Sequence, residues 1–545
     1  MNGADAIVKI LQMEGIRQVF CYPLTNLLDA LARAGVRILS SRQERVAGNM
    51  ADGVSRSTNG RQIGVFTVQS RAGAENAFAG VAHSFTDSTP VLFLPGHAGL
   101  DQIGTHPSFD CVDNYRATTK MANKVISPEL APSRLRHAFT ALRSGRPGPV
   151  MLEVLDDACK AEFKGDLEYT PIPRMRVAAD PGAVEEAAER LLRAERPMIW
   201  AGQGVLYAEA SRELVEVAEI LGIPVMTTLQ GKSGFPERHE LSAGVGAYSV
   251  TLMARHYLAE SDLILAVGSS LTVAPFTPPI PPGKAIIHAT VDPSDINKEY
   301  PAVLPVVADA KLFLAQLAEV LKSKVGKGRE AHRRETAETL SRLRNAWLEE
   351  FESLFSDDSQ PVNGYRMFRE LWSVIDPDTS IVTHESGASR DIQSVFYRAN
   401  TPRSYLGWGQ SSQLGFSLGL AMGAKIANPD KLVVNVMGDA SVGMTGMDWE
   451  TAVRENIPIL TVIKHDSIFS GYDRHIPVAI ERYKLSTQTG DYANVARALG
   501  CHAEKVETVQ DLQPALKRAI QATKDGQPAV VDVITAETRK LSKIF

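Results

Sequence analysis

The part of this sequence that most constrains its fold is the stretch of residues 432–471. An apolar run rich in β-branched residues ends at Gly438-Asp439, and a helical pattern begins at about Met447. A second β-rich run then ends in His465-Asp466. This order predicts a strand, a helix and a second strand, which form one βαβ unit with a right-handed crossover.

Two carboxylates lie at the ends of these two predicted strands. Asp439 and Asp466 are 27 positions apart, and ligands of parallel sheets bind at the carboxyl ends of the strands. Two neighbouring carboxylates suit a hard cation such as Mg²⁺, held together with a phosphorylated ligand. The backbone N–H groups of Ala440 and Ser441 can bind phosphate oxygens. The simpler alternative, in which Gly438-Asp439 only caps a helix, is weakened by the second acid.

The size and composition of the chain indicate the class of protein. A length of 545 residues is too great for one core and fits three domains of ordinary size. The composition, 44% hydrophobic and 22% charged, is typical of a soluble globular protein. With a net charge of −5 and no basic run, nothing indicates a nucleic-acid partner. Scattered cysteines and the lack of a signal peptide or membrane-spanning run predict a cytoplasmic enzyme without a membrane partner.

Strand and helix patterns alternate along most of the chain. They predict an α/β fold of three doubly wound parallel-sheet domains, over residues 1–170, 180–323 and 361–545. The first and third are similar to each other and flank a different one. Charged residues 324–360 are interpreted as a solvated helical connector, and the basic end of the chain, 537–545, as a frayed terminus.

The 432–471 stretch resembles the thiamine-diphosphate motif of the enzyme family that includes acetohydroxyacid synthase, pyruvate oxidase, benzoylformate decarboxylase, oxalyl-CoA decarboxylase and 2-hydroxyacyl-CoA lyase. That motif begins Gly-Asp-Gly and ends Asn-Asn after nearly the same spacing. Here Ala440 replaces the third residue, and His465-Asp466 replaces the Asn pair, which adds a negative charge beside a diphosphate. The resemblance implies thiamine diphosphate and Mg²⁺ as cofactors, bound by the first and third domains. It also implies that the backbone C=O of Ile468 joins Asp439 and Asp466 as a metal ligand.

Two further stretches strengthen the resemblance. An isolated acid such as Glu44 at a helix start is usually favoured by the helix dipole alone. However, residues 44–53 resemble the segment whose glutamate activates the cofactor of the neighbouring subunit, which implies a homodimer at least and a homotetramer as the expected assembly. Leu414 matches the large apolar residue that holds the two cofactor rings bent, and Gln410 just before it is expected to contact the cofactor.

The predicted substrate pocket lies on loops of the first domain. Leu24 replaces a glycine of the relatives, and Thr25 matches a substrate-contacting serine. Gln69 aligns with a histidine that transfers protons; an amide cannot act as a general acid, but it can orient an intermediate. His97 and Phe109 are weaker candidates, and a loop histidine without a role is the simpler interpretation of His97.

These features support one leading function and two alternatives. The leading hypothesis is an acetolactate-synthase-like enzyme that makes or breaks a C–C bond of a 2-oxo acid. The first alternative is an oxalyl-CoA decarboxylase or 2-hydroxyacyl-CoA lyase, because Gly446-Met447 resembles the motif of that branch of the family. The substrate would then be an acyl-CoA or an aldehyde. The second is a non-catalytic homologue that has lost the cofactor, an idea that intact Glu44 opposes.

The central domain carries a weak nucleotide signal. Gly202-Gln203-Gly204 follows a predicted strand, but it is not a complete dinucleotide fingerprint. The resemblance implies FAD, ADP or no ligand in this domain. We favour the interpretation that the central domain holds no ligand.

Overall fold

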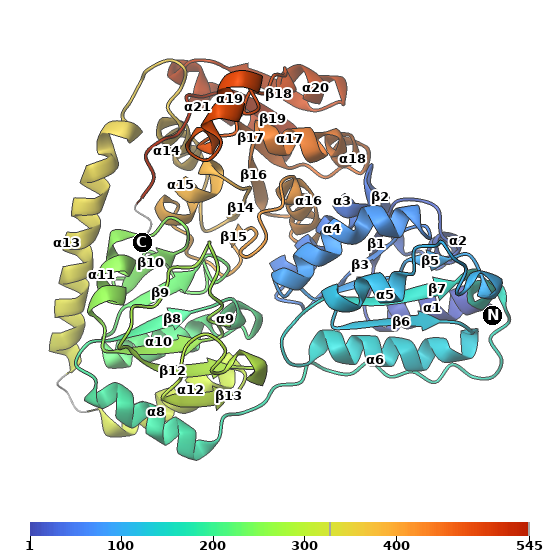
Figure 1. Ribbon diagram of the computed structural model, residues 1–545, viewed down its shortest axis with the longest axis horizontal. Coiled ribbons are helices and arrows are strands. Elements are labelled where there is room, and N and C mark those ends of the chain that lie inside the picture. The colour runs from blue at the N-terminus through green and yellow to red at the C-terminus, as the bar shows by residue number, and fades with distance from the viewer. Residues whose placement is uncertain (326–328, 543–545) are drawn as a thin grey trace.

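The computed structural model describes residues 1–325 and 329–542. Residues 326–328 of the predicted connector and 543–545 of the predicted tail lie outside the described residues. The described chain forms three parallel β-sheets with helices packed on their faces (Figure 1). The predicted α/β class with three doubly wound domains is therefore confirmed.

The first domain contains a seven-stranded parallel sheet in the order β2-β1-β3-β4-β7-β5, with β6 also paired to β7. The strands are β1 (Gln18–Cys21), β2 (Arg37–Ser40), β3 (Gly64–Thr67), β4 (Val91–Phe93), β5 (Gly96–His97), β6 (Met121–Val125) and β7 (Val150–Leu155). The helices are α1 (Gly3–Met13), α2 (Leu27–Arg33), α3 (Glu44–Ser57), α4 (Ala72–Thr86), α5 (Cys111–Tyr115), α6 (Ala131–Arg143) and α7 (Asp156–Lys160). Strand β3 is buried at every position, as expected for a sheet covered on both faces.

The central domain contains six parallel strands in the order β10-β9-β8-β11-β12-β13. They are β8 (Pro197–Ala201), β9 (Val225–Thr228), β10 (Ser242–Gly246), β11 (Leu263–Val267), β12 (Ala285–Thr290) and β13 (Leu304–Val307). The helices are α8 (Pro181–Arg193), α9 (Gly204–Tyr207), α10 (Ser211–Leu221), α11 (Leu252–Glu260) and α12 (Ala310–Lys324). The strand order reverses between β8 and β11, so a ligand crevice is expected beyond their carboxyl ends.

The third domain contains six parallel strands in the order β15-β14-β16-β17-β19-β18. They are β14 (Ser380–His384), β15 (Tyr405–Leu406), β16 (Leu432–Gly438), β17 (Leu460–His465), β18 (His502–Val506) and β19 (Ala529–Ile534). The helices are α14 (Gly364–Val374), α15 (Ala388–Phe396), α16 (Phe416–Ala427), α17 (Asp439–Thr445), α18 (Trp449–Arg454), α19 (Pro477–Tyr483), α20 (Tyr492–Ala498) and α21 (Val509–Lys524).

Strands β16 and β17 are parallel neighbours, and their connection is the βαβ unit that the sequence predicts. One detail differs, because the helix begins at Asp439 itself and not near Met447. Gly438 has extended backbone angles and caps α17, and an acid in the first helical turn is favoured by the helix dipole. A short 3₁₀ turn (Gly446–Asp448) then separates α17 from α18.

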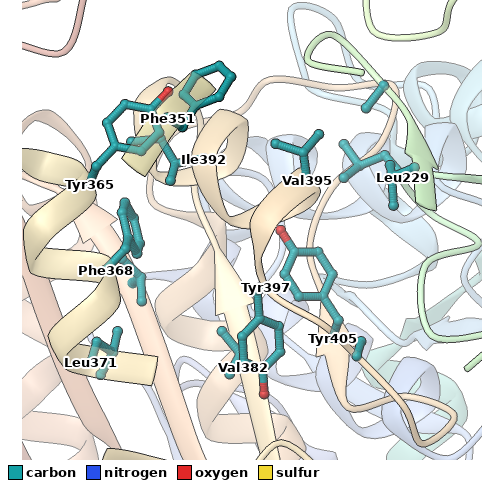
Figure 2. Close-up of a cluster of buried hydrophobic side chains, with 14 of the residues drawn as sticks. Leu229, Phe351, Tyr365, Phe368, Leu371, Val382, Ile392, Val395, Tyr397 and Tyr405 are labelled. Carbon is teal, nitrogen blue, oxygen red and sulfur yellow. The ribbon is translucent and has the colours of Figure 1, made fainter. Parts of the chain in front are cut away.

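A long helix, α13 (Arg329–Phe355), runs along the central domain and reaches the third (Figure 1). Phe351 of this helix packs beside Tyr365 in an apolar cluster that also contains Leu229 of the central domain (Figure 2). Although α13 has 27 residues, neither it nor any other described helix combines the length and apolarity needed to cross a membrane.

The described part of the C-terminal tail is held in place. The indole N–H of Trp347 donates to the hydroxyl of Ser542 at 3.1 Å, and the hydroxyl of Tyr365 donates to the carbonyl oxygen of Lys540 at 2.8 Å. Ser542 is buried. The prediction of a frayed terminus is therefore wrong for residues 537–542, because α13 and α14 supply partners that the tail sequence does not reveal.

The first and third domains meet where α3 crosses α16. A Cβ atom at Gly53 would lie 2.3 Å from the carbonyl oxygen of Leu420, and one at Gly423 would lie 2.0 Å from that of Met50. Two helix backbones can approach this closely only where the residues in contact have no side chain. These glycines therefore determine how closely the two domains pack.

We expect the substitution Gly423→Ala to lower the free energy of unfolding by about 1–3 kcal/mol, because the added methyl group overpacks the crossing. The matched control is Gly182→Ala in α8, where the nearest atom to a new Cβ is a side-chain oxygen of Asp180 at 3.1 Å. The midpoint of thermal unfolding measures both variants. Equal midpoints for the two would contradict the importance of the crossing.

Candidate active site

The two predicted acids lie at the same edge of the third sheet. Gly438 is paired with Lys464 in the β16–β17 register, so Asp439 and Asp466 follow adjacent strand ends. The N–H of Ser467 donates to Oδ2 of Asp439 at 2.7 Å, which joins the two turns. Burial, and then the negative charge of Asp466, raise the pKa of Asp439. The edge therefore concentrates negative charge and favours a cation.

Both carboxylates also have partners within the chain. Oδ1 of Asp439 accepts a hydrogen bond from the N–H of Ala440 at 2.8 Å. Oδ2 of Asp466 accepts hydrogen bonds from Nζ of Lys464 at 2.6 Å and from the hydroxyl of Ser470 at 2.9 Å. Sequence analysis missed Lys464, because a lysine near the end of a strand is normally assigned to solvent.

The remaining predicted metal ligand is the backbone carbonyl of Ile468. This residue forms an isolated antiparallel bridge with Thr487. On this side of the bridge, the hydrogen bonds use the two residues that flank Ile468, through the N–H of Phe469 and the carbonyl of Ser467. The carbonyl of Ile468 thus lies outside the pairing. Within residues 1–325 and 329–542, no group of three or more His, Cys, Asp or Glu could hold a metal. The predicted metal ligands are of another kind, because they are two carboxylates and one backbone carbonyl. Such oxygen donors fit Mg²⁺.

His465 has a structural partner that the sequence does not indicate. Its Nδ1 lies 2.9 Å from Oδ1 of Asp532, a fully buried acid on β19. Burial alone would lower the pKa of His465, but the hydrogen bond to Asp532 and the negative charge of that acid outweigh burial, and the pKa is raised. The His465–Asp532 pair therefore ties the end of β17 to β19.

Glu44 is the first residue of α3 and is buried. Its neighbours contact the third domain of the same chain. The amide of Gln43 donates to the carbonyl of Met444 in α17 at 3.1 Å, and the guanidinium of Arg45 donates to the carbonyl of Leu414 at 2.8 Å. The structure thus brings the start of α3 against both the Leu414 loop and the helix that begins at Asp439.

The loop that carries Gln410 and Leu414 is anchored on Asp87, a buried acid that sequence analysis missed. Asp87 accepts hydrogen bonds from the N–H groups of Gly409 and Gln410 at 3.1 Å. Arg56, also buried, donates to Oδ2 of Asp87 at 3.1 Å. Burial alone would raise the pKa of Asp87, but its charged and hydrogen-bonding neighbours hold it well below the usual range.

Some of the predicted substrate-pocket residues lie close together at the carboxyl edge of the first sheet. The hydroxyl of Thr67 donates to that of Thr25 at 3.3 Å. His97 and Phe109 line one small cavity together with Ser70. This edge is where a parallel sheet binds its ligands.

The other two pocket candidates are Gln69 and Leu24. Gln69 packs against the first turn of α4, since a Cβ atom at Gly73 would lie 2.7 Å from its Cγ. Leu24 is 75% exposed in the single chain. Arg71, which also lines the small cavity, was missed; it has a φ of 55°, and its guanidinium donates to Gln102 at 3.1 Å. Such angles are costly for a residue with a side chain and occur often in functional loops.

A further acid, Glu385, lies at the carboxyl end of β14, in a segment that the sequence predicts to lie near the diphosphate. It follows β14, is fully buried, and accepts a hydrogen bond from the N–H of Ser417 at 2.8 Å. Burial raises its pKa. Ser441, one of the predicted phosphate-binding residues, is buried in α17.

The central domain has a cleft of about 600 Å³ at the carboxyl ends of β8 and β11. Arg146 and Lys298 line it together with the hydroxyl groups of Ser269 and Thr272. A Cβ at Gly202 would lie 2.3 Å from the carbonyl oxygen of Gly268. The glycine is therefore required for the two strand-end turns to pack together, whether or not a phosphate binds.

Three family models match the chain in order. "Thiamine pyrophosphate enzyme, N-terminal TPP binding domain" matches residues 1–117. The "central domain" model of the same enzymes matches residues 184–317, and the "C-terminal TPP binding domain" model matches residues 385–533. The first matched segment contains Glu44, and the last contains Asp439.

Individual relatives are similar over nearly the whole chain. The probable acetolactate synthase large subunit of Methanocaldococcus jannaschii is 29% identical, over 98% of this chain and 92% of the relative. The acetolactate synthase large subunit of Corynebacterium glutamicum is 30% identical, over 98% and 87%. Glyoxylate carboligase of Escherichia coli O157:H7 is 29% identical, over 99% and 94%.

The anchor of the Leu414 loop can be tested with Asp87→Asn. We expect this change to lower the free energy of unfolding by about 1–3 kcal/mol, because it removes one of the two carboxylates, with Asp52, that pair with buried Arg56. Hydrogen exchange at the amides of Gly409 and Gln410 should also become faster. The control is Asp113→Asn, which removes an exposed acid of the same domain and should change stability by less than about 1 kcal/mol. Unchanged exchange in Asp87→Asn would refute the anchoring role.

Proposed function

Because this chain belongs to the thiamine pyrophosphate enzyme family, we propose that it is a Mg²⁺-dependent enzyme that makes or breaks a C–C bond of a 2-oxo acid. Acetolactate-synthase-like carboligation is the preferred reaction, since the relatives named above are acetolactate synthases and a carboligase. One observation carries the proposal: the carboxylates of Asp439 and Asp466 lie at the ends of adjacent parallel strands, beside the start of α17.

The oxygen donors at the ends of β16 and β17 fit the cofactor's metal and diphosphate. Asp439, Asp466 and the carbonyl of Ile468 would hold Mg²⁺. The N–H groups at the start of α17 would receive phosphate oxygens. When bound, thiamine diphosphate supplies the nucleophile and the electron sink for the reaction.

The chain's own residues then divide the remaining tasks. Glu44, a buried acid, would bind the aminopyrimidine ring and hold a proton there, a role in which a buried carboxylate is effective. Leu414 would pack against the cofactor and help to orient it. Gln69 would orient the substrate by hydrogen bonding without serving as an acid.

Exposed apolar side chains near the strand ends support an active homodimer at least, with a homotetramer as the expected assembly. Met444 and Met447, just after Asp439, are 45% and 46% exposed, and Tyr483 in α19 is 73% exposed. Large apolar side chains gathered around a site are typical of surfaces that another chain covers. In this arrangement the partner subunit would complete each cofactor site.

The acyl-CoA alternative has less support. It would require a basic groove near the C-terminal tail to bind the nucleotide part of CoA. Of the described tail residues, Arg539 pairs with Glu537 at 2.7 Å and Lys540 pairs with Glu350 at 3.4 Å.

We also propose that the central-domain cleft binds a nucleotide, FAD or ADP. Its volume of about 600 Å³ is within the range of small-molecule sites. Arg146 and Lys298 line the cleft and share Asp295 as an ion-pair partner at 2.9 and 3.2 Å, and Ser269, Ser270 and Thr272 supply hydroxyl groups for phosphate oxygens. The position at the reversal of the strand order also favours a ligand.

The enzyme proposal predicts that Glu44→Gln binds thiamine diphosphate in the presence of Mg²⁺ but loses activity by about 10²–10⁴-fold, because a proton-handling carboxylate is removed. Calorimetry with and without Mg²⁺ measures binding, and assays with pyruvate, other 2-oxo acids and acyl-CoAs measure turnover. The control is Glu129→Gln, an exposed acid that is not among the proposed site residues. If the wild type shows no Mg²⁺-dependent binding, the non-catalytic alternative is correct.

The nucleotide proposal predicts that wild-type protein binds ADP or FAD in calorimetry and that Lys298→Met weakens this binding roughly tenfold, through loss of one charge–phosphate contact. Lys322→Met, on the exposed face of α12, is the matched control and should bind as the wild type does. Wild-type protein that binds neither nucleotide would support the empty interpretation.

A further inference from the structure

The metal-binding end of β17 contains a lysine whose only ion pair among the described residues is with a predicted metal ligand. Nζ of Lys464 lies 2.6 Å from Oδ2 of Asp466. The hydroxyl of Ser470 donates to the same oxygen at 2.9 Å. In the part of the chain that the structure describes, both side-chain hydrogen bonds to Asp466 therefore end on Oδ2, and Oδ1 remains the oxygen with capacity for a metal.

Lys464 is held in this position by its surroundings. Its side chain is 4% exposed, and that of Asp466 is 7% exposed. The residue lies on β17 between β16 and β19, opposite Gly438 and Val533. A Cβ atom at Gly364 would lie 3.1 Å from Cε of Lys464, so the lysine stem packs against the first turn of α14. A buried ammonium group requires a partner charge, which Asp466 supplies.

The Lys464–Asp466 pair also reduces the electrostatic repulsion that the two carboxylates of the site would exert on a diphosphate. Asp439 is linked to the next turn by the 2.7 Å hydrogen bond from Ser467, directly after Asp466. Two carboxylates so close together repel a diphosphate, and an uncharged residue at position 466 would avoid part of that repulsion. In this chain the acid is accompanied by a lysine two positions earlier, so the added negative charge is balanced within the same strand end.

We propose that Lys464 is a charge-compensating residue of the metal and diphosphate site. Its ammonium group cancels the charge of Asp466 and thereby sets how the site divides its affinity between the cation and the anion. The inference rests on the proposed cofactor site and adds a residue to it. Because Lys464 contacts a metal ligand and not the reacting atoms, it is a positioning residue.

Charge compensation makes a prediction that a purely structural role does not. Lys464→Met should strengthen the binding of Mn²⁺ alone roughly tenfold, because Asp466 is released and a cation is removed. The same variant should weaken the binding of thiamine diphosphate at saturating Mg²⁺ by a similar factor. Mn²⁺ binding is followed by electron paramagnetic resonance and diphosphate binding by calorimetry, so neither readout depends on turnover.

The double variant Lys464→Met/Asp466→Asn tests whether the two charges act on each other. It removes both charges, and both affinities should return to within about threefold of the wild type. Lys464→Gln is a second single variant in case Lys464→Met folds poorly, and circular dichroism checks folding. Lys517→Met, which removes an exposed cation of the same domain, controls for net charge.

The outcomes separate the inference from the proposed function. Opposite shifts in the two affinities support charge compensation. If the wild type binds both ligands but both affinities fall together in the variant, or neither changes, the inference is overturned while the cofactor site stands. If the wild type itself shows no metal-dependent binding, the proposed function fails, and the inference fails with it.

Discussion

The close crossing of α3 and α16 is the interaction on which the rest of the structure depends. Gly53 and Gly423 allow the two helix backbones to touch. The crossing joins the first domain to the third and sets the start of α3 against the Leu414 loop. Glu44 and Asp439 come from opposite ends of the chain, and the elements that carry them meet because these helices pack without intervening side chains.

Around this crossing, charged groups are buried in pairs and not left to solvent. Arg56 and Asp87 connect α3, the end of α4 and the turn at Gly409. Each group would be costly to bury alone, but together they supply the partners that backbone N–H groups of the loop require. The same principle operates at the end of β17, where His465 pairs with Asp532 and Lys464 with Asp466. These pairs make the loops at the sheet edges well defined.

The end of β17 illustrates how a departure from a motif can be accommodated. Taken alone, His465-Asp466 in place of two amides suggests a damaged cofactor site. In the fold, each of the two residues has a buried partner of opposite charge or complementary hydrogen bonding. The site therefore keeps its oxygen donors, and the charge that Asp466 adds is balanced by Lys464, which favours a working site over a lost one.

The sequence by itself determined the three parallel-sheet domains and the position of Asp439 and Asp466 at adjacent strand ends. Alternating strand and helix patterns and the rule that ligands bind at carboxyl strand ends are local properties, so they can be read along the chain. Only the tertiary structure decided that Asp87 anchors the Leu414 loop, that Asp532 and Lys464 pair with the altered motif, and that the tail packs against α13. Most of these contacts join residues far apart in sequence, and the energy of every one depends on burial, which no local pattern contains.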